Sequence, residues 1–401
     1  MTAVAQGLRK QVNVVKQVAL GTLGSTGSQT IRRKSGVGQA MRDMYKSAEI
    51  VSHHQSTGAS YGLKKVDYKL DGELSAGTYQ LFIEAMLEAA FASGGTITAS
   101  TIAATVGTFT DSGDGFLAAG FKVGHVVRAS GFTGASTNSN NRNFWITALT
   151  AGIMTGVFLD GTTQAADAAG ESVTIAAVGK VCKPPLTGHT KDYLTIEDWY
   201  GDLTDSDLFG DMVVASLDFD LPASGNASFA TSLVGISRAP SGTQVLTSPT
   251  AETETGIMAA INGRLNVNGT STLITGLKIS VANGAAGTGA EVGSNSSGDV
   301  SRGVIEVSGS FTANLRDQVI TALYEAETAI NIATVLTADE TATSDFMAFV
   351  MGKVKITGDA PNDGTSNIFR TYPFTAEINH AGGAALAWDE TILTIQDSAA
   401  T

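Results

Sequence analysis

Apolar and polar residues alternate in several short stretches of this 401-residue chain. Residues 66–70 (VDYKL) and 217–221 (LDFDL) place apolar side chains at every second position, which predicts half-buried strands. Residues 78–91 and 316–327 repeat apolar residues every three or four positions, which predicts one amphipathic helix in each stretch. Thr78 and Asn314 are placed to cap these two helices.

The two helices belong to an internal repeat. Residues 62–89 align with residues 303–326, so that Gly72 stands opposite Gly309 and Met86 opposite Leu323. A second block aligns residues 195–221 with residues 332–358, with Phe209 opposite Phe346. Each copy is therefore predicted to be a β unit with one helix laid on its sheet.

The first copy contains an insertion. The first blocks are offset by 309 − 72 = 237 residues and the second by 346 − 209 = 137, so the first copy holds 237 − 137 = 100 additional residues. We place the insertion at residues 93–190, where charges are few. Short apolar runs separated by turn residues predict a small β domain, inserted at a surface loop; the runs are residues 121–132, 144–152, 154–160 and 172–178.

The sequence thus predicts a mainly β fold with two duplicated domains, one flanking helix in each, and an inserted small β domain. The expected boundaries are 1–92 for an N-terminal arm and the first part of domain 1, 93–190 for the insertion, 191–245 for the second part of domain 1, and 246–401 for domain 2. Composition agrees, because 46 glycines and only 16% charged residues argue against both a disordered chain and a helical bundle.

Charge is unevenly distributed. The net charge is −13, yet residues 1–70 hold eleven basic and three acidic residues, or +8, which leaves −13 − 8 = −21 for the remainder. An acidic body does not favour tight DNA binding, which needs cations that displace counterions. The basic N-terminal part is either a solvated, flexible arm or an arm that docks on the acidic body of a neighbouring copy.

Candidate chemistry is sparse. Gly58–Gly62 reads G-x-S-x-G, but a strand follows it where a nucleophile elbow needs a helix. The adjacent His53 and His54 would point to opposite faces of a strand and cannot bind one metal together. The single cysteine, Cys182, excludes an intrachain disulfide and a cysteine zinc site. We therefore expect no enzyme activity, no cofactor and no metal.

Several strings resemble one family. Residues 32–62 (RRKSGVGQAMRDMYKSAEIVSHHQSTGASYG), 66–87 (VDYKLDGELSAGTYQLFIEAML) and 194–221 are similar to tail tube (major tail) proteins of long, noncontractile-tailed, siphovirus-type bacteriophages. Residues 120–132 and 140–149 resemble the extra β domain of some members. Residues 344–358, 372–379 and 391–398 resemble the family's C-terminal portion.

The resemblance implies a virion structural protein, made in the bacterial host cytoplasm, whose β-sandwich domains join into stacked rings around a channel for phage DNA. Because two domains per chain can fill six places with three copies, we expect homotrimeric rings of pseudo-sixfold symmetry. The implied partners are other copies of the chain, the tape measure protein, tail terminator and initiator proteins, and passing DNA that is not bound tightly. No apolar window is long enough for a membrane helix, so no membrane insertion is expected.

Two sets of residues are candidates for these roles. Strand alternation and the resemblance place acidic side chains on the channel wall, where they repel phosphates; these are Asp67, Asp71, Glu73 and Glu306. The charge asymmetry favours contacts between rings, made by basic residues of the N-terminal part and an acidic loop; these are Arg32, Arg33, Lys34, Arg42, Lys46, Asp202, Asp205 and Asp207. The acidic loop lacks calcium-loop spacing, so its aspartates are otherwise read as solvated or capping residues.

Other classes remain open on the sequence alone. A head–tail connector or a capsid decoration protein is also a β-structured virion protein, although connectors form single rings and do not stack. A carbohydrate-binding surface protein is a third class, but it predicts a secretion signal and a cluster of aromatic residues, and neither is evident.

Overall fold

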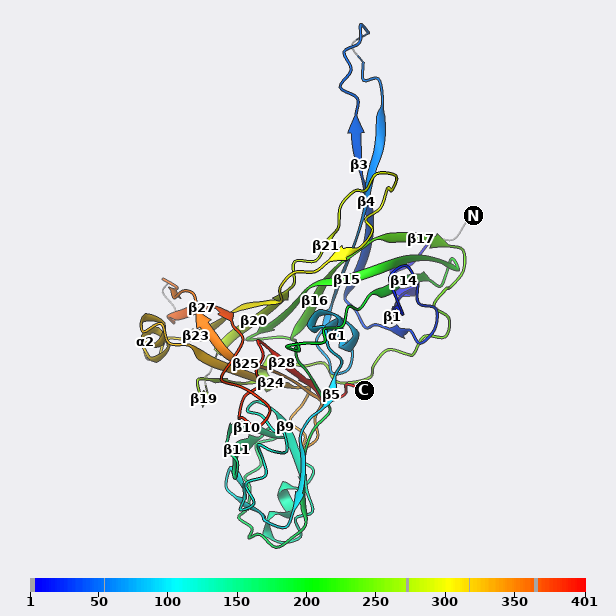
Figure 1. Cartoon of the computed structure of the whole chain (residues 1–401). Helices are drawn as coiled ribbons and strands as arrows, with labels where there is room; N and C mark the ends of the chain where they lie inside the picture. Colours follow the sequence, from blue (N-terminus) through cyan, green and yellow to red (C-terminus); the bar gives the residue numbers. More distant parts are fainter. Residues whose placement is uncertain (1–3, 54, 272–273, 317, 364–366) are drawn as a thin grey trace.

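The computed structural model describes residues 4–53, 55–271, 274–316, 318–363 and 367–401. Strands dominate this part of the chain, and α-helix is confined there to α1 (Gln80–Leu87) and α2 (Val319–Glu325). The prediction of a mainly β fold with one helix in each repeat is confirmed (Figure 1).

Eight antiparallel strands form a continuous row. Their order is β3 (Ser35–Lys46), β4 (Ala59–Glu73), β16 (Ser228–Gly235), β15 (Asp205–Pro222), β20 (Ile274–Ala282), β23 (Glu306–Asn314), β27 (Phe369–Ala376) and β25 (Phe346–Ile356). The first four strands come from the first copy of the repeat and the last four from the second. The pairing of β15 with β20 therefore joins the two copies into one sheet.

A second layer packs across the core from this row. In the first copy it contains β1 (Lys10–Lys16), β14 (Leu194–Tyr200), the first half of β15 and β17 (Ser237–Ser241). In the second copy it contains β18 (Arg264–Val267), β24 (Ile330–Thr337), the first half of β25 and β28 (Thr394–Asp397). A bulge at Val214–Ser216 marks the point where β15 passes between layers.

The core between the layers is aromatic. Tyr68 of β4 meets Phe209 of β15 edge to face, with ring centroids 5.3 Å apart. The ring centroids of Phe219 in β15 and Phe349 in β25 lie 4.8 Å apart, so the two copies share one core. Helix α1 closes this core through five buried residues, among them Phe82 and Met86.

The short elements connect these layers. They are β2 (Gln29–Thr30), β5 (Ala92–Ser93), β13 (Lys180–Cys182), β19 (Thr270–Ser271), β21 (Ala286–Gly287), β22 (Val300–Ser301), β26 (Ala360–Pro361) and the 3₁₀ turns η1 (Gly7–Arg9), η2 (Ala135–Ser139) and η3 (Ala260–Asn262). Strand β13 pairs with both β5 and β28, so the two ends of the inserted segment are held side by side against the second copy.

Residues 96–177 form a separate seven-stranded sheet with its own apolar core. Its strands are β6 (Thr96–Ala99), β7 (Ile102–Thr105), β8 (Thr108–Asp111), β9 (Val126–Ser130), β10 (Phe144–Leu149), β11 (Ile153–Phe158) and β12 (Val173–Ala177). The sequence pattern identified β9 to β12 but missed β6 to β8, which are only four residues long.

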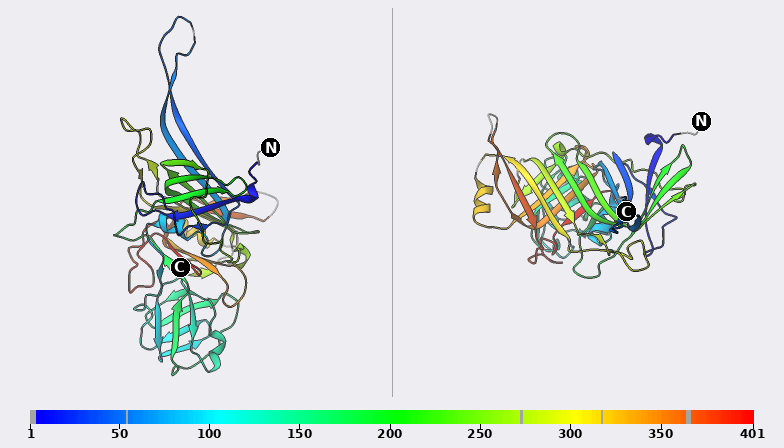
Figure 2. Two further views of the ribbon diagram at one scale, coloured as in Figure 1. Left: turned by 90° about the vertical axis from the view of Figure 1, so that its right-hand side faces the viewer. Right: turned by 90° about the horizontal axis from the view of Figure 1, so that it is seen from above.

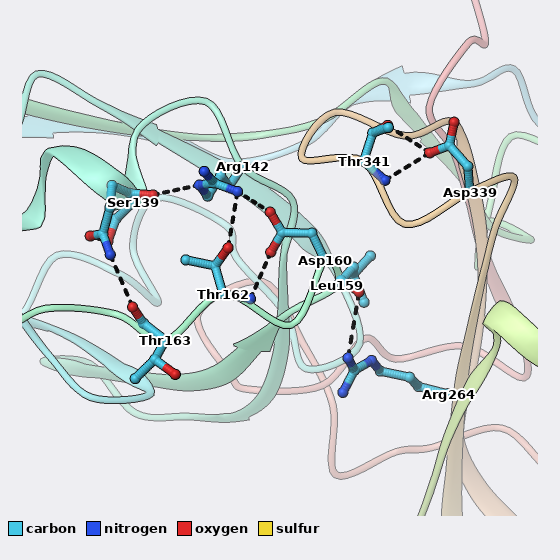
Figure 3. Close-up of polar contacts among 10 residues, drawn as sticks. Ser139, Arg142, Leu159, Asp160, Thr162, Thr163, Arg264, Asp339 and Thr341 are labelled. Carbon is cyan, nitrogen blue, oxygen red and sulfur yellow. Dashed lines mark hydrogen bonds and ion pairs between the residues drawn. The ribbon is translucent and has the colours of Figure 1, made fainter.

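This inserted unit interrupts the first copy in sequence but packs on the second copy in space. Trp145 and Leu159 share an apolar cluster with Val335 and Phe346. The Gln396 side chain bonds to both the N–H and the C=O of Val126. Figure 3 shows a further link, in which the Arg264 guanidinium donates to the Leu159 carbonyl at 3.4 Å.

One alternative for the N-terminal part and the expected helix caps are wrong. The basic N-terminal part is not a solvated, flexible arm throughout, because β1 pairs along its whole length with β14 and buries Val12 and Val14. Neither helix is capped as expected: Tyr79 and Gln318 occupy the N-cap positions, without a capping side-chain bond. The Thr78 hydroxyl instead bonds to Ser75.

Candidate assembly surfaces

The eight-stranded row ends in two open edges. Strand β3 pairs only with β4, and Lys355 and Ile356 of β25 pair only with β27, among the residues described. Each edge therefore presents backbone N–H and C=O groups that can accept another strand.

The internal repeat relates these open edges to the closed junction between the copies. Ser35 of β3 faces Asp71, and Ser280 of β20 faces Ser308; since 71 + 237 = 308, Ser35 and Ser280 are equivalent. Ser280 also faces Asp218 of β15, and 218 + 137 = 355. The equivalent of the β15–β20 junction would thus place Lys355 opposite Ser35 of a second copy.

One face of the row is uncovered and polar. Figure 2 (right) looks onto this face, and the inserted unit lies on the opposite side of the molecule (Figure 1). The other face carries the core side chains, such as Tyr68, Leu70 and Phe219. In residues 66–73 of β4 and 217–222 of β15, buried and less buried residues alternate, because successive strand side chains point to opposite faces.

The structure brings the four predicted channel acids, Asp67, Asp71, Glu73 and Glu306, to this one face. Sequence reasoning missed Asp218 and Asp220, although the alternation in residues 217–221 carried the signal. It also missed Glu377, which lies between Lys353 (2.9 Å) and Lys355 (3.0 Å). The hydrogen bonds that these lysines donate lower the pKa of Glu377.

Part of this face is cross-linked by polar contacts. The Ser280 hydroxyl donates to Asp218 at 2.6 Å, and Lys278 lies 3.3 Å from Asp220. Both contacts cross the β15–β20 junction. Polar and charged side chains therefore bond across the junction between the two copies of the repeat.

A long hairpin projects from the same side as the uncovered face. It comprises the outer parts of β3 and β4 and the connection 47–58 (Figures 1 and 2). It exposes large apolar side chains that a solitary chain does not need; these are Met41, Met44, Tyr45, Ile50 and Tyr61. The Arg42 guanidinium lies 5.9 Å from the Tyr61 ring centre, and both Arg42 and Lys46 are exposed.

The predicted inter-ring residues separate into two groups. Arg32 donates to the Thr255 carbonyl at 2.7 Å, and Arg33 donates to the Lys10 carbonyl at 2.6 Å, so both are bonded within their own chain. Lys34 is exposed at the base of the hairpin.

The acidic loop carries one exposed aspartate. Asp207 pairs with Arg238 at 2.9 Å, and Asp202 accepts the Gln6 N–H at 2.7 Å. Asp205 is exposed. Asp202 and Asp207 are therefore already bonded within their own chain.

A buried polar cluster fixes the base of the hairpin. Asp198 accepts bonds from Lys10 and from the Tyr68 hydroxyl, both at 2.7 Å, and Lys10 also donates to the Gly36 carbonyl at 2.6 Å. Burial raises the pKa of both Asp198 and Tyr68. These bonds tie the start of β3 to β1 and β14, which holds the open edge in a defined position.

The described residues contain no group of three or more His, Cys, Asp or Glu side chains placed to hold a metal ion. Ser60 lies in β4, which is followed by more strand, and Cys182 is buried, which raises the pKa of its thiol. His54 lies outside the described residues. Among the helices described, none is long and apolar enough to cross a membrane.

Two open sheet edges, a shared core and a projecting apolar hairpin are typical of structural proteins that assemble with copies of themselves. The family of phage tail tube proteins matches residues 7–376. The chain therefore belongs to this family, which makes it a structural component of the virion tail that assembles into a tube. No curated protein matches the chain.

Proposed function

We propose that three copies of the chain close into a ring by pairing the β25 edge of each copy with the β3 edge of the next. The observation that carries this is the β15–β20 junction, which already joins the two copies of the repeat in one chain. Repeating this junction at the open edges generates six similar domains from three chains.

The ring would enclose a channel for phage DNA. Its wall would be the uncovered face, with seven acidic and four basic side chains: Asp67, Asp71, Glu73, Asp218, Asp220, Glu306 and Glu377 against Lys69, Lys278, Lys353 and Lys355. A wall with net negative charge gains nothing from counterion release and lets DNA slide. The inserted unit, on the opposite side, would decorate the outside of the tube.

The hairpin would join stacked rings. We assign the inter-ring contacts to Arg42 and Lys46 on the hairpin and to Asp205 on the acidic loop of the adjacent ring. Arg32 and Arg33, like Asp202 and Asp207, are better assigned to holding the chain itself, because of their internal bonds. Since the hairpin stands on the channel side, an open channel requires it to lie along the wall toward the next ring in the assembled tube.

In this account the tube is of the siphovirus type, with the tape measure protein inside it during assembly and the terminator and initiator proteins at its ends. DNA ejection into the host would follow release of the tape measure protein from the channel.

A cysteine pair tests the ring. Ser35→Cys and Lys355→Cys in one chain would face each other across the proposed seam, where opposite Cβ atoms lie about 5 Å apart. Mild oxidation of assembled tubes should give covalent trimers on a non-reducing gel. Gln39→Cys with Lys355→Cys is the matched control, because Gln39 lies four residues, or about 13 Å, further along β3.

Equal cross-linking of both pairs, or none in assembled tubes, would contradict the seam. Covalent ladders that end at six chains would retain the tube but refute the two-domain trimer.

A further inference from the structure

Helix α2 is less covered than its repeat partner α1, although Ile320 and Leu323 are partly buried against the core. None of the seven residues of α2 is buried, and α1 buries five of its eight. Beside α2 runs a groove of about 380 Å³, which includes Ala313, Ile320, Leu323 and Tyr372. The apolar face of the helix is therefore buried in the first copy and largely exposed in the second.

The segment that links the two copies, residues 253–263, packs beside the residues that lead into α1. The Met258 N–H donates to the Leu74 carbonyl and the Met258 carbonyl accepts from Ala227 N–H, both at 2.9 Å. The fully buried Met258 side chain belongs to the same core cluster as Met86. The Thr255 hydroxyl donates to the Ala76 carbonyl at 2.7 Å, just before the helix.

The repeat shows which segment corresponds to this link in the first copy. The 3₁₀ turn η3 precedes β18 as η1 precedes β1, and 260 − 7 = 253 and 262 − 9 = 253. The same offset places Asn266 opposite Asn13, both buried, and Val267 opposite Val14. The segment just before β1 is therefore the equivalent of the link.

This N-terminal segment is apolar and exposed. The offset of 253 sets Val4 opposite the half-buried Ile257 and Leu8 opposite Ile261, which is 83% exposed. Apolar residues are kept at both positions, but only the first is partly covered in the link. Val4 is 82% and Leu8 100% exposed. The hydrogen bond from Gln6 to Asp202 holds it weakly, since such an exposed bond contributes little.

The segment and α2 lie at opposite ends of the molecule (Figures 1 and 2). A chain cannot cover its own α2 with it, but a neighbour joined at the β25 edge brings its own first copy to that end. This follows from the ring under "Proposed function", on which the inference rests.

We propose that residues Val4–Arg9 of one copy occupy the groove beside α2 of the next copy, in the way that the link packs beside the residues that lead into α1 within the chain. Val4 would lie against Leu323 and Ile320. In the first copy, Met258 of the link lies between Leu74 and Ala227 and bonds to the backbone of both. In the second copy the equivalent residues, Phe311 and Tyr372, pair directly with each other and leave no space between them. The neighbour's segment would therefore lie over the groove and not between these strands.

Hydrogen exchange on the full chain tests this directly. Amides of residues 4–9 and 319–326 should exchange rapidly in the dispersed protein and become protected together in tubes. Protection of the β3 and β25 edges without protection of α2 would overturn the inference and leave the ring intact. Failure of the dispersed protein to form any ring would overturn both.

A substitution provides the second measurement. Val4→Glu should raise the protein concentration needed for assembly by roughly tenfold to a hundredfold, because a valine is no longer buried at each seam. Val106→Glu is the control: it makes the same substitution at an exposed turn of the inserted unit. Equal assembly of the two variants would refute the role of Val4, whose exposure in the single chain makes misfolding an inadequate explanation for any loss.

Discussion

Two glycines at the same place in the repeat allow aromatic side chains to lie against the sheet. A Cβ at Gly72 would overlap the Tyr79 hydroxyl, and one at Gly309 would overlap the Phe374 ring and the Lys278 carbonyl. The alignment of Gly72 with Gly309 was visible in the sequence. Its cause was not, because the contact of each glycine with its aromatic residue forms only in the folded protein.

Gly72→Ala and Gly309→Ala should each lower the free energy of unfolding by about 1–3 kcal/mol, as overpacking does. Gly276→Ala on β20 should stay within about 1 kcal/mol of wild type, because its nearest neighbour, the Leu221 carbonyl, is 3.8 Å away. Urea unfolding of the dispersed chain measures all three. Equal effects at the three positions would show that close packing is not the reason for glycine.

Two buried titratable groups pull the stability in opposite directions as pH changes. Asp397 accepts the Gly77 N–H at 2.8 Å, and burial raises its pKa to about 6 from 3.8. The His125 ring nitrogens have no hydrogen-bond partner among the described residues, and burial lowers the pKa of His125 to about 4 from 6.5.

Between pH 4 and 6, folded Asp397 holds a proton that the unfolded chain releases, so this group adds stability as pH falls. Folded His125 lacks a proton that the unfolded chain binds, so this group removes stability over pH 6.5 to 4. Each shift corresponds to about 3 kcal/mol.

Asp397→Asn should therefore lose stability more steeply than wild type from pH 7 to 4.5, and His125→Leu less steeply. Urea midpoints across this range provide the measurement. Parallel pH profiles for all three proteins would refute the assignment.

At the scale of elements, the sequence predicts strands well where apolar and polar residues alternate, as in residues 66–70. The sequence predicts α1 and α2 to be equally buried, because the periodicity of apolar residues shows that a helix has an apolar face but not which residues cover that face. The open edges of β3 and β25 were not predictable, since partners in a sheet are set by distant segments. The acidic residues predicted to line the channel share the uncovered face of the row. Alternation alone does not say which face of a sheet lines a channel.

The contrast between the helices gives a prediction. Met86→Ala in α1 should lower the free energy of unfolding of the dispersed chain by about 2–5 kcal/mol, as for a buried side chain. Leu323→Ala, at the aligned position of α2, should lower it by less than about 1 kcal/mol, because α2 has no buried residue in the single chain. A similar loss for both would mean that α2 is packed within its own chain.

At the scale of the molecule, the placement of charge on the uncovered face predicts how tubes meet DNA. Asp71→Lys with Asp218→Lys should convert tubes that do not retain DNA into tubes that do, with binding that weakens steeply as salt rises. Glu252→Lys with Glu340→Lys makes the same change in net charge at exposed positions away from this face. Filter binding at several salt concentrations distinguishes them, and equal retention by both variants would contradict the channel wall.

The inserted unit shows why domain order in sequence does not give arrangement in space. Residues 96–177 leave and re-enter the first copy, yet their apolar cluster with Val335 and Phe346 ties them to the second. A sequence break marks where a unit is inserted, but the surface on which it rests is set by complementary side chains far away.

The rotational symmetry of assembled tubes, measured by cryo-electron microscopy, tests the central claim most directly. Three chains of eight strands each should give rings of 3 × 8 = 24 strands, with threefold symmetry and β3 of each copy beside β25 of the next. Rings of six chains, or rings in which these two edges do not meet, would contradict the account.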